Sequence, residues 1–401
     1  MTQEQNIRSN QITKVQPKGT ATIVLMVAVS MATVFLATPG RKADAALKLT
    51  VNTSGDAANT SRYGCDTNPF LAGDQCTLRA ALQAANSGAG VDTIGFRIPS
   101  SDPGCDATGL CTINVLSPLP VISEGVSIIG PGATRLQVKG SGLRISTSDE
   151  VKISRISIAE ADVGVWTSSN GTLTISESVV TKSSAYGIRL DSYGTVYVTD
   201  STISDNLPYG VYCDYGTINL IRSTVMGSST AVRSGVYSAV NIINSTLTRN
   251  GNPNGPVAYS IYSEGRLLIT NSTAAYNVAP IRQAGPYRGV IRSSIIENSG
   301  NDALAGAFSS EGFNVVGLHD GGFIAAPTDL SGNGKLGPLQ NNGGITYTFA
   351  LQPGSIAIDN GNAFGLTTDQ RGSPYVRTID KPSIPNATGG DGTDSGAFEI
   401  Q

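Results

Sequence analysis

A short pattern recurs in the middle of the chain and brings aromatic and charged residues to one side of a strand. The segments read GVWTS, GIRLD, GVYCD, GVYSA and SIYSE. In each, the second residue is Val or Ile, which predicts that it points inward and that the third residue points outward. The third residues are Trp166, Arg189, Tyr212, Tyr237 and Tyr262. Aromatic rings flanked by polar groups suit stacking on sugar rings, so this stripe is a candidate surface for binding polysaccharide. The alternative is an aromatic ladder that merely covers the sheet.

Two acidic residues follow the stripe and form a candidate cation site. Asp191 and Asp214 hold the same position in successive segments. Two carboxylates on neighbouring strands repel each other, so either a cation lies between them or Arg189 neutralises them. Calcium is the cation expected outside the cell. Arg189 with these two carboxylates also matches a fragment of a calcium-dependent polysaccharide lyase, in which Arg189 would be the base.

The composition narrows the class of protein. The chain has 401 residues, 47 of them Gly, and only 14% are charged. Such a chain favours β structure outside the cell over a helical bundle. The formal net charge of -3 argues against a broad basic surface for nucleic acid. His319 is the only histidine and lies in a Gly-rich segment, so we interpret it as an ordinary loop residue.

The stripe belongs to a repeat of about 22 residues. A serine column shows the period: Ser178, Ser201, Ser223, Ser245, Ser272 and Ser293. Apolar columns, such as the one that runs from Ile153 to Val290, keep the same period. One turn cannot bury its apolar face alone, so successive turns must share a core. The sequence therefore predicts an all-β fold, a right-handed parallel β-helix with a loop-rich C-terminal end.

The segment CTLRAALQAAN, from Cys76 to Asn86, is the one strong helix signal. Its Leu and Ala residues recur at helical spacing, and Thr77 is placed to cap the helix. A β-helix leaves strand edges and core exposed at its end, so we expect this helix to cover the N-terminal end. The alternative is a helix that binds a partner.

Four cysteines lie in or near this segment. Cys65 and Cys76 flank one loop, and Cys105 and Cys111 flank another. Two short-range disulfides are expected if the chain is exported to an oxidising compartment.

The N-terminus has the features of an export signal. Lys14 and Lys18 precede an apolar run at 21–37, and Ala43 to Ala45 fits a cleavage site. The alternative is an uncleaved membrane anchor.

Both ends resemble a group of bacterial secreted proteins. The segments CTLRAALQAANSGAGVDTIGFRI and LSPLPVISEGVSIIGPG resemble the CSLREA-type N-terminal region, with Ala80 in place of the motif's Glu. The segments LGPLQNNGG, ALQPGSIAIDNGN, TTDQRGSP and DSGAFEIQ are similar to the choice-of-anchor Q domain. The resemblance implies a β-helix and export, but no reaction. Because the sequence ends at Gln401, we expect no C-terminal anchor.

These observations predict four regions: a signal or anchor at 1–45, a cap at 46–112, the β-helix at 113–300 and the C-terminal region at 301–401. In the last, Asp359, Asp369, Arg371 and Asp394 are expected to join loops through charge-assisted hydrogen bonds or to hold a second cation. We expect a secreted or cell-surface protein that binds polysaccharide or cell-envelope material without catalysis. The alternatives are the calcium-dependent lyase and a structural or adhesion module. A membrane would be contacted only through an uncleaved N-terminal segment.

Overall fold

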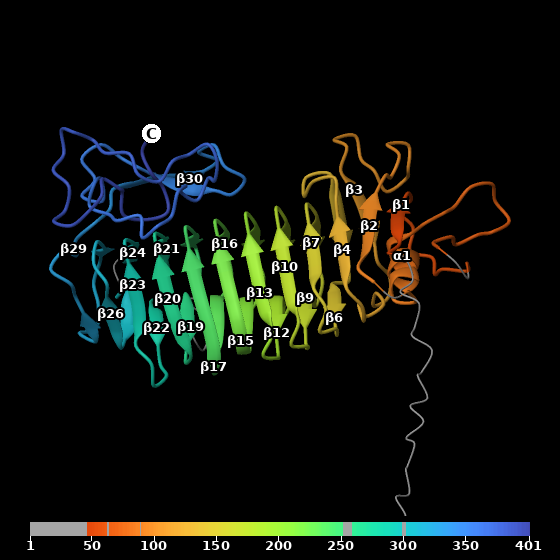
Figure 1. Ribbon diagram of the computed structural model, residues 1–401, viewed down its shortest axis with the longest axis horizontal. Helices are drawn as coiled ribbons and strands as arrows, with labels where there is room; N and C mark the ends of the chain where they lie inside the picture. Colours follow the sequence, from red (N-terminus) through yellow and green to blue (C-terminus); the bar gives the residue numbers. More distant parts are fainter. Residues whose placement is uncertain (1–45, 62–63, 89, 252–258, 299–301) are drawn as a thin grey trace, which may run out of the picture. The chain divides into compact units, whose positions relative to one another are not determined.

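Parallel strands make up most of the structure. The computed structural model describes residues 46–61, 64–88, 90–251, 259–298 and 302–401, which belong to one compact unit. Within them, parallel strands form an 18-stranded and an 11-stranded sheet (Figure 1). The predicted export signal at 1–45 lies outside the described residues.

Successive turns place their strands on three faces. The first face holds β6 (Leu143–Ile145), β9 (Val163–Thr167), β12 (Tyr186–Leu190), the first parts of β15 (Tyr209–Ile221) and β17 (Thr230–Ile243), β19 (Ile261–Ser263), β22 (Ile281–Gln283) and β25 (Leu304–Gly306). The second holds β1 (Lys48–Val51), β2 (Asp92–Phe96), β4 (Val126–Ile129), β7 (Val151–Ser154), β10 (Thr172–Ser176), β13 (Thr195–Thr199), the remaining parts of β15 and β17, β20 (Arg266–Thr270), β23 (Gly289–Arg292), β26 (Phe308–Ser310) and β28 (Phe323–Ile324). The third holds β3 (Cys111–Asn114), β5 (Leu136–Lys139), β8 (Ser157–Ala159), β11 (Val179–Thr181), β14 (Thr202–Ser204), β16 (Thr224–Met226), β18 (Thr246–Thr248), β21 (Thr273–Asn277), β24 (Ile295–Asn298), β27 (Val315–Val316) and β29 (Leu330–Ser331).

The apolar columns predicted from the period form the core. Ile175, Val198 and Leu220 are partners on successive second-face strands, and all three are fully buried. The predicted parallel β-helix is therefore confirmed. Parallel pairing continues beyond residue 300, because β24 pairs with β27 and β27 with β29.

A buried serine column forms the corner between the second and third faces. Ser245 Oγ accepts the N–H of Ser223 at 3.1 Å and donates to the carbonyl of Ile243 at 2.8 Å. Turns from Ser178 onward repeat this arrangement. The last serine of the column is Ser294, whose Oγ accepts from Ser272, and not Ser293 as predicted. The prediction was wrong by one residue because two serines are adjacent there, and Ser293 instead occupies the left-handed corner position (φ 47°).

Helix α1 (Leu78–Ala85) packs against β1 and β2 at the N-terminal end, as predicted (Figure 1). Leu78 and Leu82 are buried in the shared core, and Thr77 Oγ1 accepts the N–H of Ala80 at 3.0 Å. Arg79 forms an ion pair of 2.8 Å with Asp56, which fastens the helix to the preceding loop.

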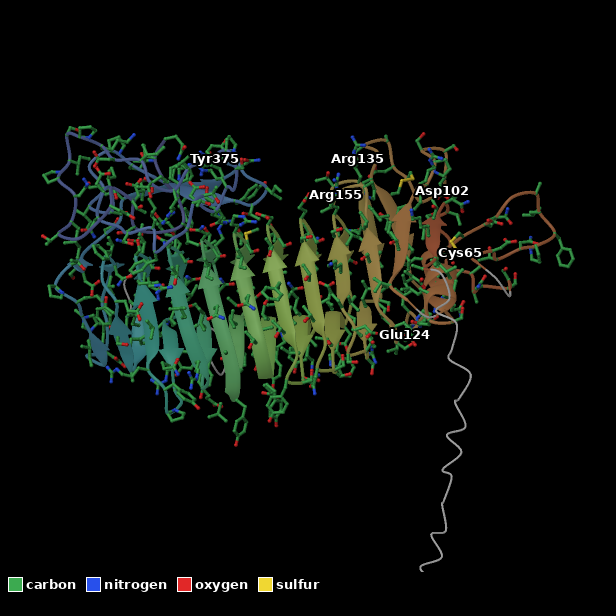
Figure 2. All side chains as sticks on the ribbon, viewed as in Figure 1. Cys65, Asp102, Glu124, Arg135, Arg155 and Tyr375 are labelled. Carbon is green, nitrogen blue, oxygen red and sulfur yellow. A yellow bond between two sulfur atoms is a disulfide. The ribbon has the colours of Figure 1, made fainter. Side chains whose placement is uncertain are left out.

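Both predicted disulfides are present. Cys65 bonds to Cys76 beside α1, and Cys105 bonds to Cys111 across a neighbouring loop (Figure 2). The remaining cysteine, Cys213, is buried, and burial raises the pKa of its thiol to about 12.

The C-terminal region lies along the corner between the second and third faces. It includes one antiparallel hairpin, β30 (Leu336–Gln340) with β31 (Thr348–Leu351), and is otherwise built of loops (Figure 1). Thr224, Thr246 and Thr273 hold one position on successive third-face strands, and each bonds to this region. Their Oγ1 atoms contact the carbonyl of Tyr347, the side chain of Gln370 and the N–H of Ala397.

Buried charges join the loops of the C-terminal region. Asp369 and Arg371 form an ion pair of 2.7 Å, and Asp394 accepts the N–H of Ile400 at 2.8 Å. Asp359 accepts the N–H of Lys381. The predicted charge-assisted hydrogen bonds are thus observed, and the predicted second cation site stays a prediction.

The serine column yields a first prediction. Replacing Ser245 with Ala leaves the buried N–H of Ser223 without its acceptor, so the free energy of unfolding should fall by about 1–3 kcal/mol. Urea unfolding followed by circular dichroism measures this. Ser148→Ala, at an exposed position, is the control and should change little. An equal effect in both variants would contradict a structural role for the column.

The raised pKa of Glu399 predicts how the free energy of unfolding depends on pH. Burial raises the pKa of Glu399 to about 9, and the neighbouring Asp394 adds to the effect. In the unfolded state Glu399 releases its proton above its ordinary pKa of 4.5, whereas in the folded state it keeps the proton up to about pH 9. The contribution of Glu399 to the free energy of unfolding is therefore complete below pH 4.5 and is lost as the pH rises to about 9. Glu399→Gln should flatten the stability profile over this window, whereas Glu150→Gln, on the surface, should not. Parallel profiles for wild type and Glu399→Gln would contradict the assignment.

Candidate functional site

The predicted stripe is a ladder of alternating arginines and aromatic residues on the first face. Strand pairing places its members on successive rungs: Arg144, Trp166, Arg189, Tyr212, Arg233, Tyr262 and Arg282. Most are partly exposed, and the flanking Val, Ile and Leu residues are buried. The structure thus brings Trp166, Arg189, Tyr212 and Tyr262 into one outward column, as predicted.

The planar groups of the ladder stack on one another. The guanidinium carbons of Arg144 and Arg189, on the rungs before and after Trp166, lie 4.9 Å and 5.1 Å from its ring centroid. Arg233 lies 4.3 Å from the ring centroid of Tyr262. Cation–π contacts of this kind stabilise the face. They also occupy the ring faces that a sugar would need, which favours the sheet-covering interpretation for this column.

Asp191 and Asp214 are bound by ladder residues. Asp191 accepts from Trp166 Nε1 and Arg189 Nε, each at 2.9 Å, and Asp214 accepts from the Tyr212 hydroxyl at 2.9 Å. Burial and this bond raise the pKa of Tyr212 to about 12.

These hydrogen bonds affect two predictions from the sequence, namely Arg189 as a base and a cation between Asp191 and Asp214. The hydrogen bond to Asp191 raises the pKa of Arg189, so this guanidinium is a poor base. Among the described residues, no group of three or more His, Cys, Asp or Glu residues is arranged to hold a metal ion. Calcium at Asp191 and Asp214 remains a prediction.

Tyr237 does not belong to the ladder. Its predicted place is taken by Arg233, which pairs with Tyr212, whereas Tyr237 pairs with Tyr215 after a bulge that follows Cys213. The error arose because β17 contains two similar triplets, AVR and GVY, and only the valine of the first is fully buried.

Tyr237 instead belongs to a second aromatic column at the corner between the first and second faces. The rings of Tyr193 and Tyr215 lie 5.2 Å apart, and those of Tyr215 and Tyr237 lie 5.9 Å apart and nearly parallel. Tyr193 and Tyr237 are 66% and 67% exposed, so this column presents far more aromatic surface than the ladder does.

A groove of about 400 Å³ runs beside these corner tyrosines. Its lining includes the small residues Gly216, Thr217, Ser238 and Ala239, together with Val236, Tyr193, Tyr237, Arg266 and Tyr287. Thr217, Ala239 and Arg266 occupy successive rungs, so the groove follows the stacking direction, at ~5 Å per rung.

Among the residues that the structure describes, Arg266 is the one charged residue that lines this groove. Its guanidinium lies 5.2 Å from the ring centroid of Tyr287, and in the described part of the chain it forms no ion pair with a carboxylate. It is therefore available to an anionic or hydroxyl-rich ligand.

The sequence contained signals for the residues that were missed. Tyr193, Tyr215 and Tyr237 share the 22-residue period, and Arg144 follows a Gly–Leu pair like the other ladder segments. Tyr287 lies in a loop outside the strands, and no periodic signal marks it.

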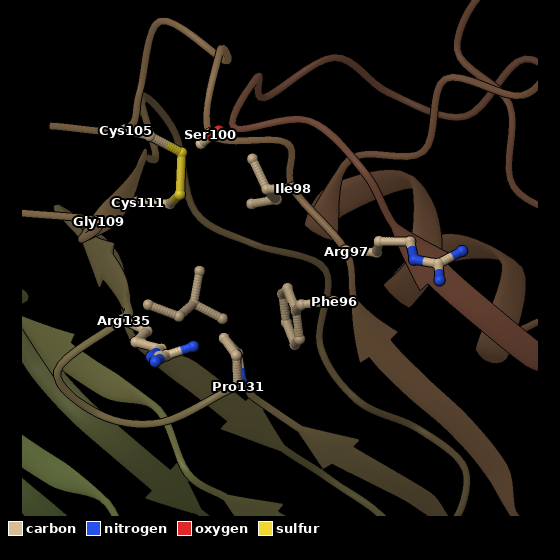
Figure 3. Close-up of a pocket in the computed structure, with 10 residues that line it drawn as sticks. Phe96, Arg97, Ile98, Ser100, Cys105, Gly109, Cys111, Pro131 and Arg135 are labelled. Carbon is tan, nitrogen blue, oxygen red and sulfur yellow. A yellow bond between two sulfur atoms is a disulfide. The ribbon is translucent and has the colours of Figure 1, made fainter. Parts of the chain in front are cut away.

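A smaller cavity of about 180 Å³ lies under the Cys105–Cys111 disulfide (Figure 3). Phe96, Ile98 and Pro131 surround it, and Arg97 points away from it (Figure 3). This lining is largely apolar and offers few groups for chemistry.

Comparisons with known proteins give a family match and a similar solved structure. Residues 123–238 match the family model described as the right handed beta helix region. The crystal structure of pectate lyase Pel9A is similar, with a TM-score of 0.46 and 11% identity, over 89% of this chain and 98% of that chain. No curated protein matches the chain. Together with the strand pairing, the family match shows that the fold is a right-handed parallel β-helix.

The ladder yields a prediction at Asp191. Asp191→Asn removes the charge opposite Arg189, and since this pair is partly exposed, the free energy of unfolding should fall by about 1 kcal/mol. Trp166 is the only tryptophan, so its emission maximum should shift in the same variant, because the group that accepts from its Nε1 loses its charge. Asp214→Asn, which alters only the Tyr212 contact, should leave the fluorescence unchanged. A shift in both variants would argue against a specific Trp166–Asp191 bond.

Proposed function

We propose that the protein is an exported β-helix protein that binds polysaccharide, without catalysis, in the groove beside the corner tyrosines. The observation that carries this proposal is the exposure of Tyr193 and Tyr237 next to a groove whose other lining residues are mostly small. Exposed tyrosines supply apolar ring surface and a hydroxyl, the combination that sugars require.

The shape of the groove favours a polymer. It spans successive rungs and remains open to solvent, so it fits consecutive sugar units of a chain better than one enclosed ligand. Arg266 adds a hydrogen-bonding cation at one end. The ladder then has a supporting role, because its internal contacts stiffen the face next to the groove.

Export is supported by the covalent structure. Disulfides persist in oxidising compartments, and two are present here. No helix in the described residues is long and apolar enough to cross a membrane. The resemblance of the end regions to CSLREA-type and choice-of-anchor Q proteins also favours export.

Tyr237→Ala should weaken binding to polysaccharide. Loss of one aromatic contact costs about 1 kcal/mol, or roughly fivefold in affinity. Affinity electrophoresis in gels that contain neutral or acidic polysaccharides measures the change.

Tyr347→Ala is the matched control, because Tyr347 is also exposed but does not line the groove. If both variants bind polysaccharide as tightly as the wild type does, the binding site lies elsewhere on the protein. Failure of the folded wild type to bind any polysaccharide would contradict the proposal and favour a structural module.

A further inference from the structure

A second cavity, of about 370 Å³, lies beside the last turns of the third face. Its lining comes from β21, β24, the residues after β27, and β29 with the residues that follow it. It consists of Tyr276, Glu297, Asn298, Gly317, Leu318, Ser331, Gly332 and Asn333. It shares no lining residue with the groove beside the corner tyrosines. Binding here is therefore independent of the proposed function.

Glu297 is the unusual member of this cavity. Its side chain is buried, with 8% of the residue exposed, and its Oε2 accepts the N–H of Gly334 at 2.9 Å. In the described part of the chain, no Lys, Arg or His forms an ion pair with it. Burial raises its pKa, and the hydrogen bond from Gly334 only partly offsets this effect.

A buried carboxylate without a cation is costly, so its charge suits a positively charged ligand. The described lining residues include a single carboxylate, whereas Ca²⁺ needs six to eight oxygen ligands, often from several carboxylates. An ammonium group needs only one carboxylate together with hydrogen-bond acceptors.

The other lining residues suit a sugar that carries this ammonium group. Tyr276 is 45% exposed, which leaves aromatic surface for contact with the ligand. Asn298 Nδ2 already donates to two backbone carbonyls, so this residue offers its Oδ1 to a ligand. Asn333 Oδ1 already accepts the N–H of Lys335, so Asn333 offers its Nδ2, and Ser331 offers its hydroxyl. Such groups match the hydroxyls of a sugar ring better than the apolar stem of a lysine side chain.

We propose that this cavity binds an amino sugar through an ion pair between its ammonium group and Glu297. The side chains of Asn298, Ser331 and Asn333 hydrogen-bond the ring hydroxyls, and Tyr276 packs against the ring.

The experiment compares glucosamine, N-acetylglucosamine and Nα-acetyl-lysine amide as ligands of the full chain, by NMR titration or calorimetry. Glucosamine should bind saturably. N-acetylglucosamine, which lacks the charge, should bind about tenfold more weakly or not at all. Equal binding of the two sugars, or no saturable binding of glucosamine to the folded protein, would overturn the proposal. Tighter binding of the lysine compound would overturn the assignment to a sugar.

Glu297→Gln tests the residue itself. Gln keeps an oxygen that can accept from Gly334, so the fold should be retained, and the melting temperature confirms this. The variant should lose glucosamine binding by about tenfold or more. Glu311→Gln removes an exposed carboxylate that is paired with Arg292, and should bind as the wild type does. Unchanged glucosamine binding by a folded Glu297→Gln would also overturn the proposal. Polysaccharide binding in the Tyr237 groove should be unaffected, so the two proposals fail separately.

Discussion

The fold depends on satisfying the backbone where the chain bends between the second and third faces. At each bend one residue adopts a left-handed conformation, as Arg222 and Asn244 do. The next residue then places its N–H inside the protein, away from its strand partners. In turn after turn a serine hydroxyl from the following turn accepts this N–H, for example Ser245 for Ser223. An unpaired buried N–H would cost about as much as a lost hydrogen bond, so the serine period is a requirement of the fold.

The alignment of each turn with the next also determines which side chains are neighbours on the outer surface. Once one turn lies directly above another, side chains 22 residues apart become neighbours, whether or not they attract each other. On the first face the neighbours alternate between cations and rings, and they satisfy one another. At the adjacent corner the neighbours are tyrosines, which stack and leave their surface exposed. The same repeat thus produces a self-contained ladder and an open aromatic column side by side.

The sequence was sufficient for the fold and for part of the site. Apolar periodicity, the helix signal and the paired cysteines predicted the β-helix, α1 and both disulfides, because each depends on residues close in sequence or related by the period. The register within β17 was harder to predict, because Val232 and Val236 both follow a small residue. Only the packing in the structure shows that Val232 is the fully buried one. The contacts between the C-terminal region and the β-helix could not be predicted from the sequence. Gln370 and Thr246 are 124 residues apart and share no period.

The C-terminal region limits where a polymer can bind. It covers third-face strands through Thr224, Thr246 and Thr273, and these outward threonines are fully or almost fully buried as a result. It also reaches the adjoining corner at Asn244 and Asn271, whose side-chain amides donate to its carbonyls. The corner at Tyr193, Tyr215 and Tyr237 lies across the second face from these contacts and keeps its exposed rings. A long ligand aligned with the turns therefore has its open aromatic surface at the corner between the first and second faces. The register of the β-helix sets the spacing of the side chains that such a ligand would meet.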